Sequence, residues 1–292
     1  MEYYSVNGEI VPVAQARLGA ADLGLLRGYG VFDYFRVVRG TPLFIDDYLA
    51  RFERSVNLLN MELPVTLAEL KRHIHELIEA NSASEAGVRL LLTGGYSPDG
   101  FTPAEPNLVV LEHPLTPPDE ERYRRGSNLT VYEYVRDIPE VKTTNYAVAI
   151  QQLPQQRAAD AIDVLYHQQG RVSETSRSNI FIVKAGVILT PGERILRGIT
   201  RKQILHLARE RFEVQETEIT LEDVYSADEV FITSSVKGVM PIVKVGESVI
   251  GSGQPGDVSR QLVKAFAAHV EDYLVARGRY PQPDLQPVNN AV

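Results

Sequence analysis

The chain has 292 residues, of which 44% are hydrophobic and 23% are charged. This composition is typical of a folded globular protein, and the length suffices for one large domain or for two ordinary ones. The formal net charge of -8 disfavours nucleic acid and anionic membranes as general partners. The absence of cysteine excludes disulfides, thiolate metal sites and cysteine nucleophiles.

We expect a cytoplasmic protein without a membrane anchor. The first residues lack a basic stretch followed by an apolar one, which a signal peptide would have. No apolar run reaches the roughly 18 residues of a membrane helix. The 6 histidines are scattered along the chain, and no metal site is predicted.

Residues 1–114 are predicted to form a small α+β domain. Short apolar runs separated by glycines predict strands and tight turns over the first part of it. Farther on, apolar residues recur at helical spacing; Asp46 and Asp47 are placed to cap one helix, and Thr66 and Glu69 have the form of a capping box. The predicted elements are helices at 46–60 and 66–80, strands at 88–92 and 108–111, and a loop at 94–100.

A segment rich in proline and charge, 115–127, is predicted to link this domain to a second one. Residues 128–278 form the predicted large domain, whose mixed order of elements lacks the regular βαβ alternation of a doubly wound sheet. Residues 279–292 are predicted to be a loose tail. The predicted elements of the large domain are strands at 129–134, 180–183, 187–189 and 229–233 and helices at 200–212 and 257–277.

Lys142 is the first candidate catalytic residue. It lies among small polar residues at a predicted transition from strand to helix. A desolvated lysine in such a place can form a Schiff base with a carbonyl compound. The alternative is a solvated surface lysine, which is the commoner case for this residue type.

Three other segments have features of an anion site. Ile199 and Thr200 begin a predicted helix, with Thr200 as the expected N-cap and Gln203 in the capping-box position. Free N–H groups at a helix start bind phosphate, although an ordinary capped helix is the alternative. The polar run around Ser235 is compatible with a backbone nest for an anion, and Arg51 could bind phosphate oxygens.

Glu174 directly precedes a strongly apolar strand. Its carboxylate is therefore expected to be buried and to need a partner. That partner could be a protonated ring nitrogen of a ligand. A salt bridge to Arg171 or Arg177 is the alternative.

Several short motifs occur in a fixed order along the chain. They are Arg27-Gly-Tyr-Gly-Val-Phe-Asp33, Arg51-Phe-Glu-Arg-Ser55, Lys142-Thr-Thr-Asn145, Ser173-Glu-Thr-Ser-Arg-Ser-Asn179, Gly198-Ile-Thr-Arg201, and Thr233-Ser-Ser235 followed by Pro241. In this combination the chain resembles the class IV, or branched-chain-type, pyridoxal-phosphate aminotransferases over about residues 1 to 276. The ordered set is specific, although no single motif is.

The resemblance implies a two-domain α/β fold with pyridoxal 5′-phosphate at the interface between a small N-terminal and a larger mixed C-terminal domain. Lys142 corresponds to the lysine that binds the cofactor covalently and then moves a proton. Glu174 corresponds to the carboxylate that keeps the pyridine nitrogen protonated. Tyr146 is expected near the O3′ atom of the cofactor. The residues that correspond to the phosphate site are Arg51, Ile199, Thr200 and Ser235.

The family forms homodimers whose active sites take residues from both subunits. The resemblance therefore implies that Arg27 and the loop 94–100 serve the neighbouring subunit.

The substrate is less well defined by the resemblance. The spacing from Lys142 to Asn145 is that of D-amino-acid aminotransferases and aminodeoxychorismate lyases. The arginine and histidine with which known D-enzymes bind the substrate carboxylate fall on Asp99 and Phe101, so that pair is absent. Phe32 likewise replaces the tyrosine of many D-enzymes.

Three cations offer a replacement, namely Arg27, Arg89 and Lys237. If they converge, they would bind the α-carboxylate, and also the distal carboxylate of glutamate or 2-oxoglutarate. The alternative is that Arg89 pairs with an acidic residue and that Lys237 is solvated. We expect a D-amino-acid aminotransferase that acts on D-glutamate or D-alanine. A branched-chain L-amino-acid aminotransferase is the main alternative, followed by an aminodeoxychorismate-type lyase and a catalytically silent binding protein.

Overall fold

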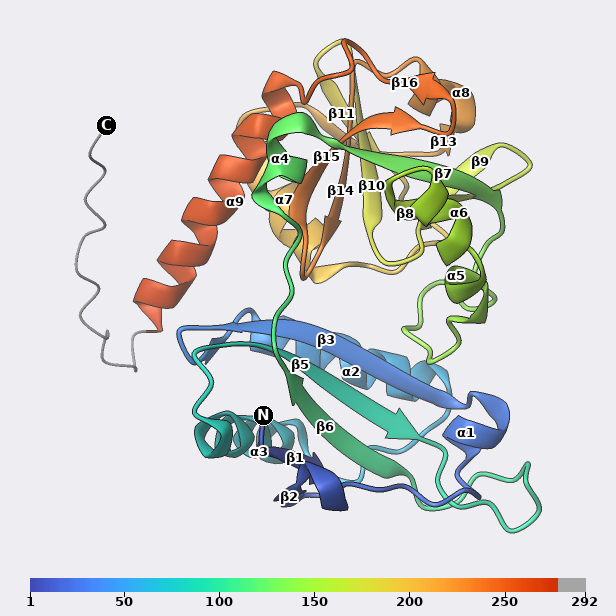
Figure 1. Cartoon of the computed structure of the whole chain (residues 1–292), viewed down its shortest axis with the longest axis vertical. Helices are drawn as coiled ribbons and strands as arrows, with labels where there is room; N and C mark the ends of the chain where they lie inside the picture. Colours follow the sequence, from blue (N-terminus) through green and yellow to red (C-terminus); the bar gives the residue numbers. More distant parts are fainter. Residues whose placement is uncertain (278–292) are drawn as a thin grey trace.

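The computed structural model describes residues 1–277, which form two sheet-containing domains (Figure 1). The segment that follows the small domain leads directly into the large one. Part of the predicted linker 115–127 is helical, as α4 (Glu120–Arg125), and Ser127 already belongs to the first strand of the large domain. The predicted tail 279–292 and residue 278 lie outside the described residues.

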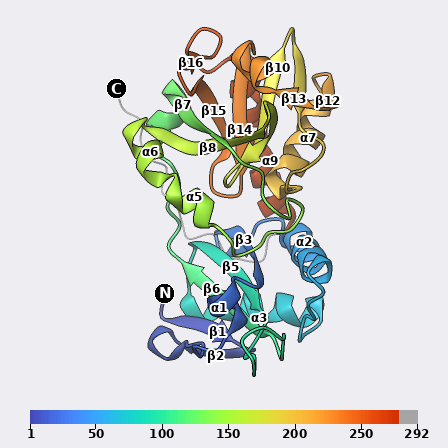
Figure 2. The ribbon, with the colours of Figure 1, turned by 90° about the vertical axis from the view of Figure 1, so that its right-hand side faces the viewer.

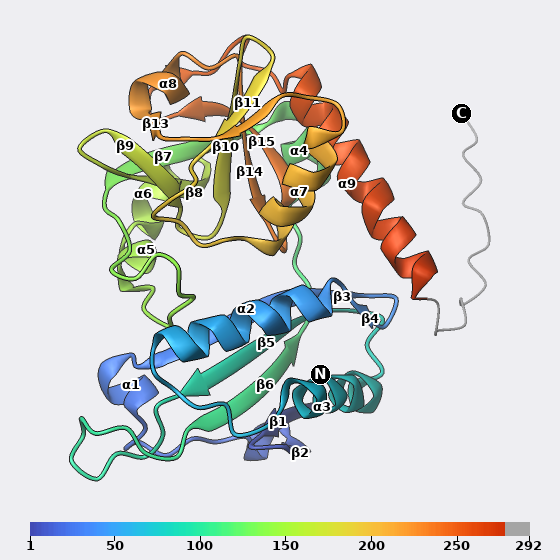
Figure 3. The same ribbon diagram turned by 180° about the vertical axis from the view of Figure 1, so that it is seen from behind.

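The small domain is built on an antiparallel six-stranded sheet with the order β2-β1-β6-β5-β3-β4. Helices α2 (Ile45–Leu58) and α3 (Leu67–Asn81) cover one face of this sheet (Figure 3). The start of the chain also forms two short helices that were not predicted, η1 (Val13–Gln15) and α1 (Leu23–Arg27). The strands are β1 (Tyr3–Val6), β2 (Glu9–Pro12), β3 (Gly30–Val38), β4 (Thr41–Pro42), β5 (Glu85–Thr93) and β6 (Asn107–His113).

The two helices begin in different ways. Thr66 and Glu69 form the predicted capping box of α3, and each side chain bonds the other residue's backbone N–H. The prediction for α2 was wrong, because its N-cap is Phe44, a residue in the left-handed region with φ of 51° and no capping side chain. Asp46 and Asp47 lie inside the first turn, where their charge still favours the helix dipole.

Alternation along β3 separates the two faces of the sheet. Val31 and Phe35 are fully buried in a core that they share with Phe52 of α2. Each such side chain contributes about 1.5 to 3 kcal/mol by leaving water. Phe32 and Tyr34 point to the opposite face, which also carries the exposed Arg89 of β5.

The large domain contains a mixed sheet of 10 strands in the order β12-β11-β10-β14-β15-β7-β8-β9-β13, with β16 paired to β15. The strands curve around an apolar core (Figure 2). A second core forms where α7 (Ile199–Arg209) and α9 (Asp257–Ala276) pack on the sheet. The strands are β7 (Ser127–Glu133), β8 (Ala161–Gln168), β9 (Arg171–Thr175), β10 (Asn179–Lys184), β11 (Val187–Thr190), β12 (Val214–Glu216), β13 (Ile219–Thr220), β14 (Glu229–Ser234), β15 (Gly238–Val245) and β16 (Ser248–Val249). The remaining helices are α5 (Ala147–Gln151), α6 (Leu153–Ala158) and α8 (Leu221–Tyr225).

Helix α9 joins the two domains. Its first turns pack on the large domain, whereas its last turns reach the small one (Figure 1). There Tyr273 lies with its ring centre 4.6 Å from that of Phe44, and Leu274 is buried in the small-domain core. The orientation of the two domains is thus fixed by packing as well as by the connecting segment. Among residues 1–277, none of the helices has the length and hydrophobicity needed to cross a membrane.

Candidate active site

One pocket brings together side chains from both domains. All seven predicted cofactor-binding residues line it, although they come from five separate parts of the chain. They are Arg51, Lys142, Tyr146, Glu174, Ile199, Thr200 and Ser235. The pocket is also lined by Arg136, Arg177, Asn179 and Thr233.

Lys142 is held against the small domain by the backbone on either side of it. Its carbonyl accepts a hydrogen bond of 2.9 Å from the backbone N–H of Phe32, and the N–H of Thr144 donates to Gly30 at 3.0 Å. The lysine Nζ lies 4.5 Å from the centre of the Phe32 ring. The ring of Tyr146 meets Phe32 edge-on, with 5.5 Å between the ring centres. The amine is thereby positioned inside the pocket by a segment that lies outside the named strands of both sheets.

Arg51 is fixed by a buried carboxylate. Its Nε and Nη2 atoms donate to Asp33 at 2.9 and 2.6 Å, and the Asp33 side chain is fully buried. A bidentate pair of this kind fixes the guanidinium plane. Nη1 of Arg51 lies 3.5 Å from the carbonyl of Arg197.

Hydroxyl groups and a helix start lie beside Arg51. The Tyr48 and Ser235 hydroxyls are 2.7 Å apart, and Tyr48 also bonds the Thr200 hydroxyl. Ile199 and Thr200 occupy the first turn of α7, whose N–H groups have no partners within the helix. The N-cap is Gly198 and not Thr200 as predicted, and no side chain caps this helix. Gln203 makes no capping box either, because its amide donates to Asp47.

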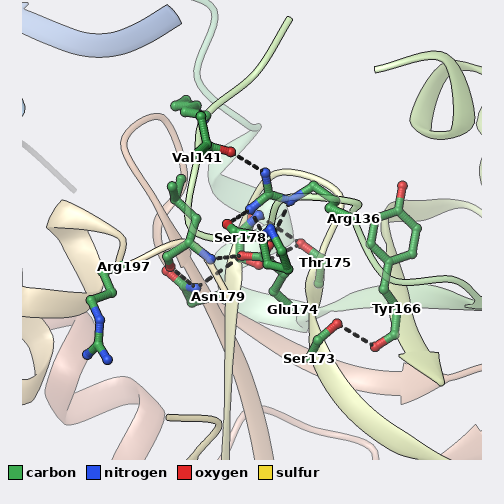
Figure 4. Close-up of polar contacts among 12 residues, drawn as sticks. Arg136, Val141, Tyr166, Ser173, Glu174, Thr175, Ser178, Asn179 and Arg197 are labelled. Atoms are coloured by element: carbon green, nitrogen blue, oxygen red, sulfur yellow. Dashed lines mark hydrogen bonds and ion pairs between the residues drawn. The ribbon is translucent and has the colours of Figure 1, made fainter. Parts of the chain in front are cut away.

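At another point of the pocket wall, Glu174 is held by several donors (Figure 4). Arg136 donates to its Oε1 from Nε at 2.9 Å and from Nη2 at 2.7 Å. Its Oε2 accepts from the backbone N–H of Leu196 at 3.0 Å and from Asn179 at 3.4 Å. Burial raises the pKa of Glu174 above its usual value, and the Arg136 charge opposes that rise.

The cation beside Glu174 is therefore neither Arg171 nor Arg177. Arg171 pairs instead with Glu218 on the surface, and Arg177 is exposed. The sequence does not mark Arg136 as buried, because this residue lies in an irregular segment without hydrophobic periodicity. The carboxylate indicated that a partner was needed, but it could not indicate which arginine would fold onto it.

The pocket fits pyridoxal 5′-phosphate by the chemistry of its groups. Arg51, three hydroxyls and a helix start suit a phosphate. Glu174 suits a protonated ring nitrogen, and Lys142 suits an aldehyde. Moreover, the Thr233 hydroxyl lines the pocket and is buried without a hydrogen-bond partner, as a polar group does when it awaits a ligand. Within residues 1–277, no cluster of histidines and carboxylates could hold a metal.

The three cations predicted to bind substrate do not line this pocket. Lys237 is buried, and its Nζ donates to Asp163 at 3.2 Å and to Ser178 at 3.1 Å, so it is neither solvated nor free for a substrate. Arg27 is exposed on α1 and donates to the carbonyl of Leu26. Lys237 is therefore not available to the predicted three-cation pocket, and Arg27 does not reach this pocket from its own chain.

Of the three cations, Arg89 has the position that best suits binding of a substrate carboxylate. Its guanidinium carbon is 5.2 Å from the centre of the same Phe32 ring that Lys142 approaches. It forms no ion pair with a carboxylate in the part of the chain that the structure describes. The alternative prediction, that an acidic residue neutralises it, is therefore also wrong.

The loop 94–100 is held together by Asp99, one of the two residues at the positions of the absent carboxylate-binding pair. Its side chain accepts bonds from the backbone of Phe101 and Thr102 and from the Ser97 hydroxyl. These bonds hold the pKa of Asp99 far below its usual value.

Comparison with known proteins places this geometry in a family. The model of the family "Amino-transferase class IV" matches residues 30–245. A Methanocaldococcus jannaschii protein named "Putative branched-chain-amino-acid aminotransferase" is 32% identical over 89% of this chain and 94% of its own length. The D-alanine aminotransferase of Bacillus licheniformis is 30% identical over the same shares of both chains. The crystal structure of an Escherichia coli branched-chain amino acid aminotransferase superimposes with a TM-score of 0.86 at 25% identity, covering 91% of this chain and 94% of that one. A branched-chain amino acid aminotransferase solved with pyridoxamine 5′-phosphate superimposes equally well, with a TM-score of 0.86 at 26% identity.

Proposed function

We propose that this chain, which belongs to the class IV family of pyridoxal-phosphate-dependent aminotransferases, moves an amino group between a D-amino acid and a 2-oxo acid. D-Glutamate and D-alanine are the favoured donors, and 2-oxoglutarate is the favoured acceptor. The observation that carries the proposal is the position of Arg89, a guanidinium without a carboxylate partner on the same aromatic ring as the Lys142 amine.

When bound, the cofactor supplies an electron sink that stabilises negative charge at the substrate Cα. Lys142 is the catalytic residue in this proposal, because its amine is positioned to release the cofactor and then to carry the proton. Glu174 would hold the proton on the ring nitrogen, and the Arg136 charge favours the ionised form of Glu174. Tyr146 lies on the same wall as Lys142 and is proposed to contact O3′.

Four residues are proposed to hold the phosphate group. Arg51 supplies charge, the N–H groups of Ile199 and Thr200 supply the helix start, and Ser235 supplies a hydroxyl. Asp33 and Tyr48 position two of these groups, so neither Arg51 nor Ser235 has to be ordered when the phosphate arrives. Pre-organisation of this kind lowers the entropic cost of binding.

A substrate whose amino group lies at Lys142 can direct a carboxylate toward Arg89. The Phe32 ring lies close to both groups, with its centre 4.5 Å from Lys142 Nζ and 5.2 Å from the guanidinium carbon of Arg89. Arg89 is exposed and has no carboxylate partner in the described chain, so its guanidinium is available for a charge-assisted bond to a substrate carboxylate. The polarity of this face therefore favours a carboxylate-bearing substrate, and the Lys142-to-Asn145 spacing favours the D-enzymes.

A homodimer is part of the proposal. Beside Arg27, the exposed side chains of α1 and of the loop after β5 are unusually apolar: Leu25 is 73% and Phe101 77% exposed. The loop tip and α1 are adjacent. A side-chain β-carbon at Gly100 would lie 3.8 Å from Arg27 Nη2 and 4.0 Å from Leu26 Cδ1. Grouped exposed apolar side chains are typical of protein interfaces. We propose that a second subunit covers them and receives Arg27.

The branched-chain L-amino-acid aminotransferases are the second candidate, because relatives and solved structures with that name match over nearly the whole chain. The two functions are separated by mixing the purified enzyme with D-glutamate, D-alanine or L-leucine and following the absorbance of the cofactor. We expect the D-amino acids to convert the cofactor to its pyridoxamine form and L-leucine to leave it unchanged. Conversion by L-leucine alone would establish the second candidate, and the Lys142→Ala variant serves as the control for non-enzymatic exchange.

A further inference from the structure

A buried ion pair lies directly behind the pocket, and the proposed function leaves it unused. Asp163 of β8 is fully buried and carries a charge. Burial acts to raise its pKa, but Lys237 and neighbouring donors outweigh that effect and lower it. The side-chain donors to its carboxylate are Lys237 Nζ at 3.2 Å, Thr175 Oγ1 at 3.0 Å, Ser176 Oγ at 2.5 Å and Ser178 Oγ at 3.4 Å.

The three hydroxyl donors come from one tight turn, which follows Glu174 without interruption. Thr175 and Ser178 close this turn, since the N–H of Thr175 donates to the Ser178 carbonyl at 2.8 Å and the N–H of Ser178 donates to Thr175 Oγ1 at 2.9 Å. Asp163 therefore holds the turn as a whole. Any shift of the turn would move the Glu174 carboxylate with it.

Lys237 comes from a second pocket-lining turn, between β14 and β15. Ser234 and Ser235 line the pocket at that turn, and the Lys237 N–H donates to Ser234 Oγ at 3.3 Å. Its Nζ reaches across to Asp163 and to Ser178 Oγ, which is 3.1 Å away. Lys237 thus joins the proposed phosphate-binding turn to the turn that carries Glu174.

Stability alone does not explain such a pair. Two charges that leave water lose about as much hydration energy as they gain from each other, and apolar residues of similar size are often as stable or more stable. A buried pair with fixed geometry can instead impose one arrangement on the groups around it. Here the groups are the two turns that would bind opposite ends of one ligand.

We propose that Asp163 and Lys237 are positioning residues that set the distance between the Glu174 turn and the Ser235 turn. The inference rests on the proposed roles of Glu174 and Ser235. Neither member of the pair needs to touch the cofactor. Its loss should leave a folded protein that binds pyridoxal phosphate weakly and protonates the ring nitrogen incompletely.

The test uses the full-length enzyme carrying Asp163→Asn, Lys237→Met or both. Either single substitution leaves a buried group without its partner and is expected to destabilise the fold. The double variant removes both charges, so its thermal unfolding should return close to that of the wild type. Dialysis of each enzyme against buffer then gives the dissociation constant of pyridoxal phosphate, and the absorbance of the bound cofactor reports the protonation of its ring.

We expect the double variant to be stable but to bind the cofactor at least about tenfold more weakly, with an altered absorbance maximum. Amino transfer should slow by up to about 100-fold, the loss that a misplacement of about 1 Å can cause. Wild-type affinity and absorbance in a stable double variant would overturn the proposal. A double variant that remains as unstable as the singles, with normal affinity per folded molecule, would also overturn it.

Two controls complete the design. Glu229→Gln alters a carboxylate at the far end of β14, where it accepts N–H bonds from Val258 and Ser259 at the start of α9. It should lower stability without changing cofactor affinity. Glu174→Ala tests the assignment on which the inference rests: if its cofactor affinity and absorbance match the wild type, the proposed function is at fault. A clear effect of Glu174→Ala with none in the double variant would overturn the positioning pair alone.

Discussion

Replacing Arg136 with methionine should destabilise the fold, because Arg136 is the cation that pairs with the buried Glu174 carboxylate. In the protein, the two side chains are only 13% and 7% exposed and their closest atoms lie 2.7 Å apart. Removal of one partner of a buried pair usually costs about 3 to 5 kcal/mol. Protonation of Glu174 limits this cost, because neutralising an ordinary glutamate at pH 7 requires about 3 to 4 kcal/mol. The two estimates agree. We therefore expect Arg136→Met to lower the free energy of unfolding by about 4 kcal/mol at pH 7.

The destabilisation caused by Arg136→Met should depend on pH. Burial already raises the pKa of Glu174, and loss of Arg136 should raise it further. A carboxyl group whose pKa is raised by folding favours the folded state at low pH and loses that effect as the pH rises. The difference in unfolding free energy between wild type and Arg136→Met should therefore be smaller at pH 5 than at pH 7.

Urea denaturation of both proteins without cofactor, at pH 5 and pH 7, measures this difference. The matched control is the double variant Arg136→Met with Glu174→Gln. It has no titrating group at this position, so its free energy of unfolding should contain no pH-dependent contribution from residue 174. A destabilisation of equal size at both pH values would refute the reasoning, because it would show that Glu174 does not change its protonation state.

Three further predictions concern catalysis, specificity and stability. Lys142→Ala should abolish amino transfer in a single-turnover assay while circular dichroism shows an unchanged fold; persisting turnover would remove Lys142 from its role. Arg89→Leu should raise the KM for D-glutamate and 2-oxoglutarate about tenfold or more, through loss of a charge-assisted bond, whereas an unchanged KM in steady-state kinetics would exclude Arg89 from the substrate site. Burial lowers the pKa of His269, which stacks on Phe44 and bonds Gln203 at 3.0 Å. The neutral form is thus favoured by folding, and stability should fall as the pH drops below the ordinary value of 6.5; if His269→Gln retains the wild-type pH dependence of urea unfolding, the histidine is not its source.

The sequence predicted helix starts correctly where an interaction within one turn determines them. The capping box of Thr66 and Glu69 requires only residues of one turn, and it formed as predicted. The expected N-cap at Thr200 failed, because Gly198 allowed the helix to begin earlier and the Thr200 hydroxyl bonds Tyr48 from the other domain. Helix α1 was missed since it has only 5 residues, too few to show a period.

The candidate site was predictable to the extent that it rests on ordered motifs. Those motifs identified the residues that meet in the pocket, from Arg51 to Ser235. They could not identify pairings between distant parts of the chain, such as Arg136 with Glu174 or Lys237 with Asp163. In both cases the sequence shows a charged residue in an apolar setting, but only the fold determines which opposite charge comes within reach.

The central claim is that the enzyme transfers amino groups from D-amino acids. It is tested most directly by incubating the enzyme with racemic glutamate and a 2-oxo acid other than 2-oxoglutarate, followed by chiral chromatography of the remaining glutamate. The account predicts that D-glutamate disappears while L-glutamate is untouched. Consumption of the L-enantiomer with D-glutamate left intact would contradict it and would place the chain with the L-specific enzymes.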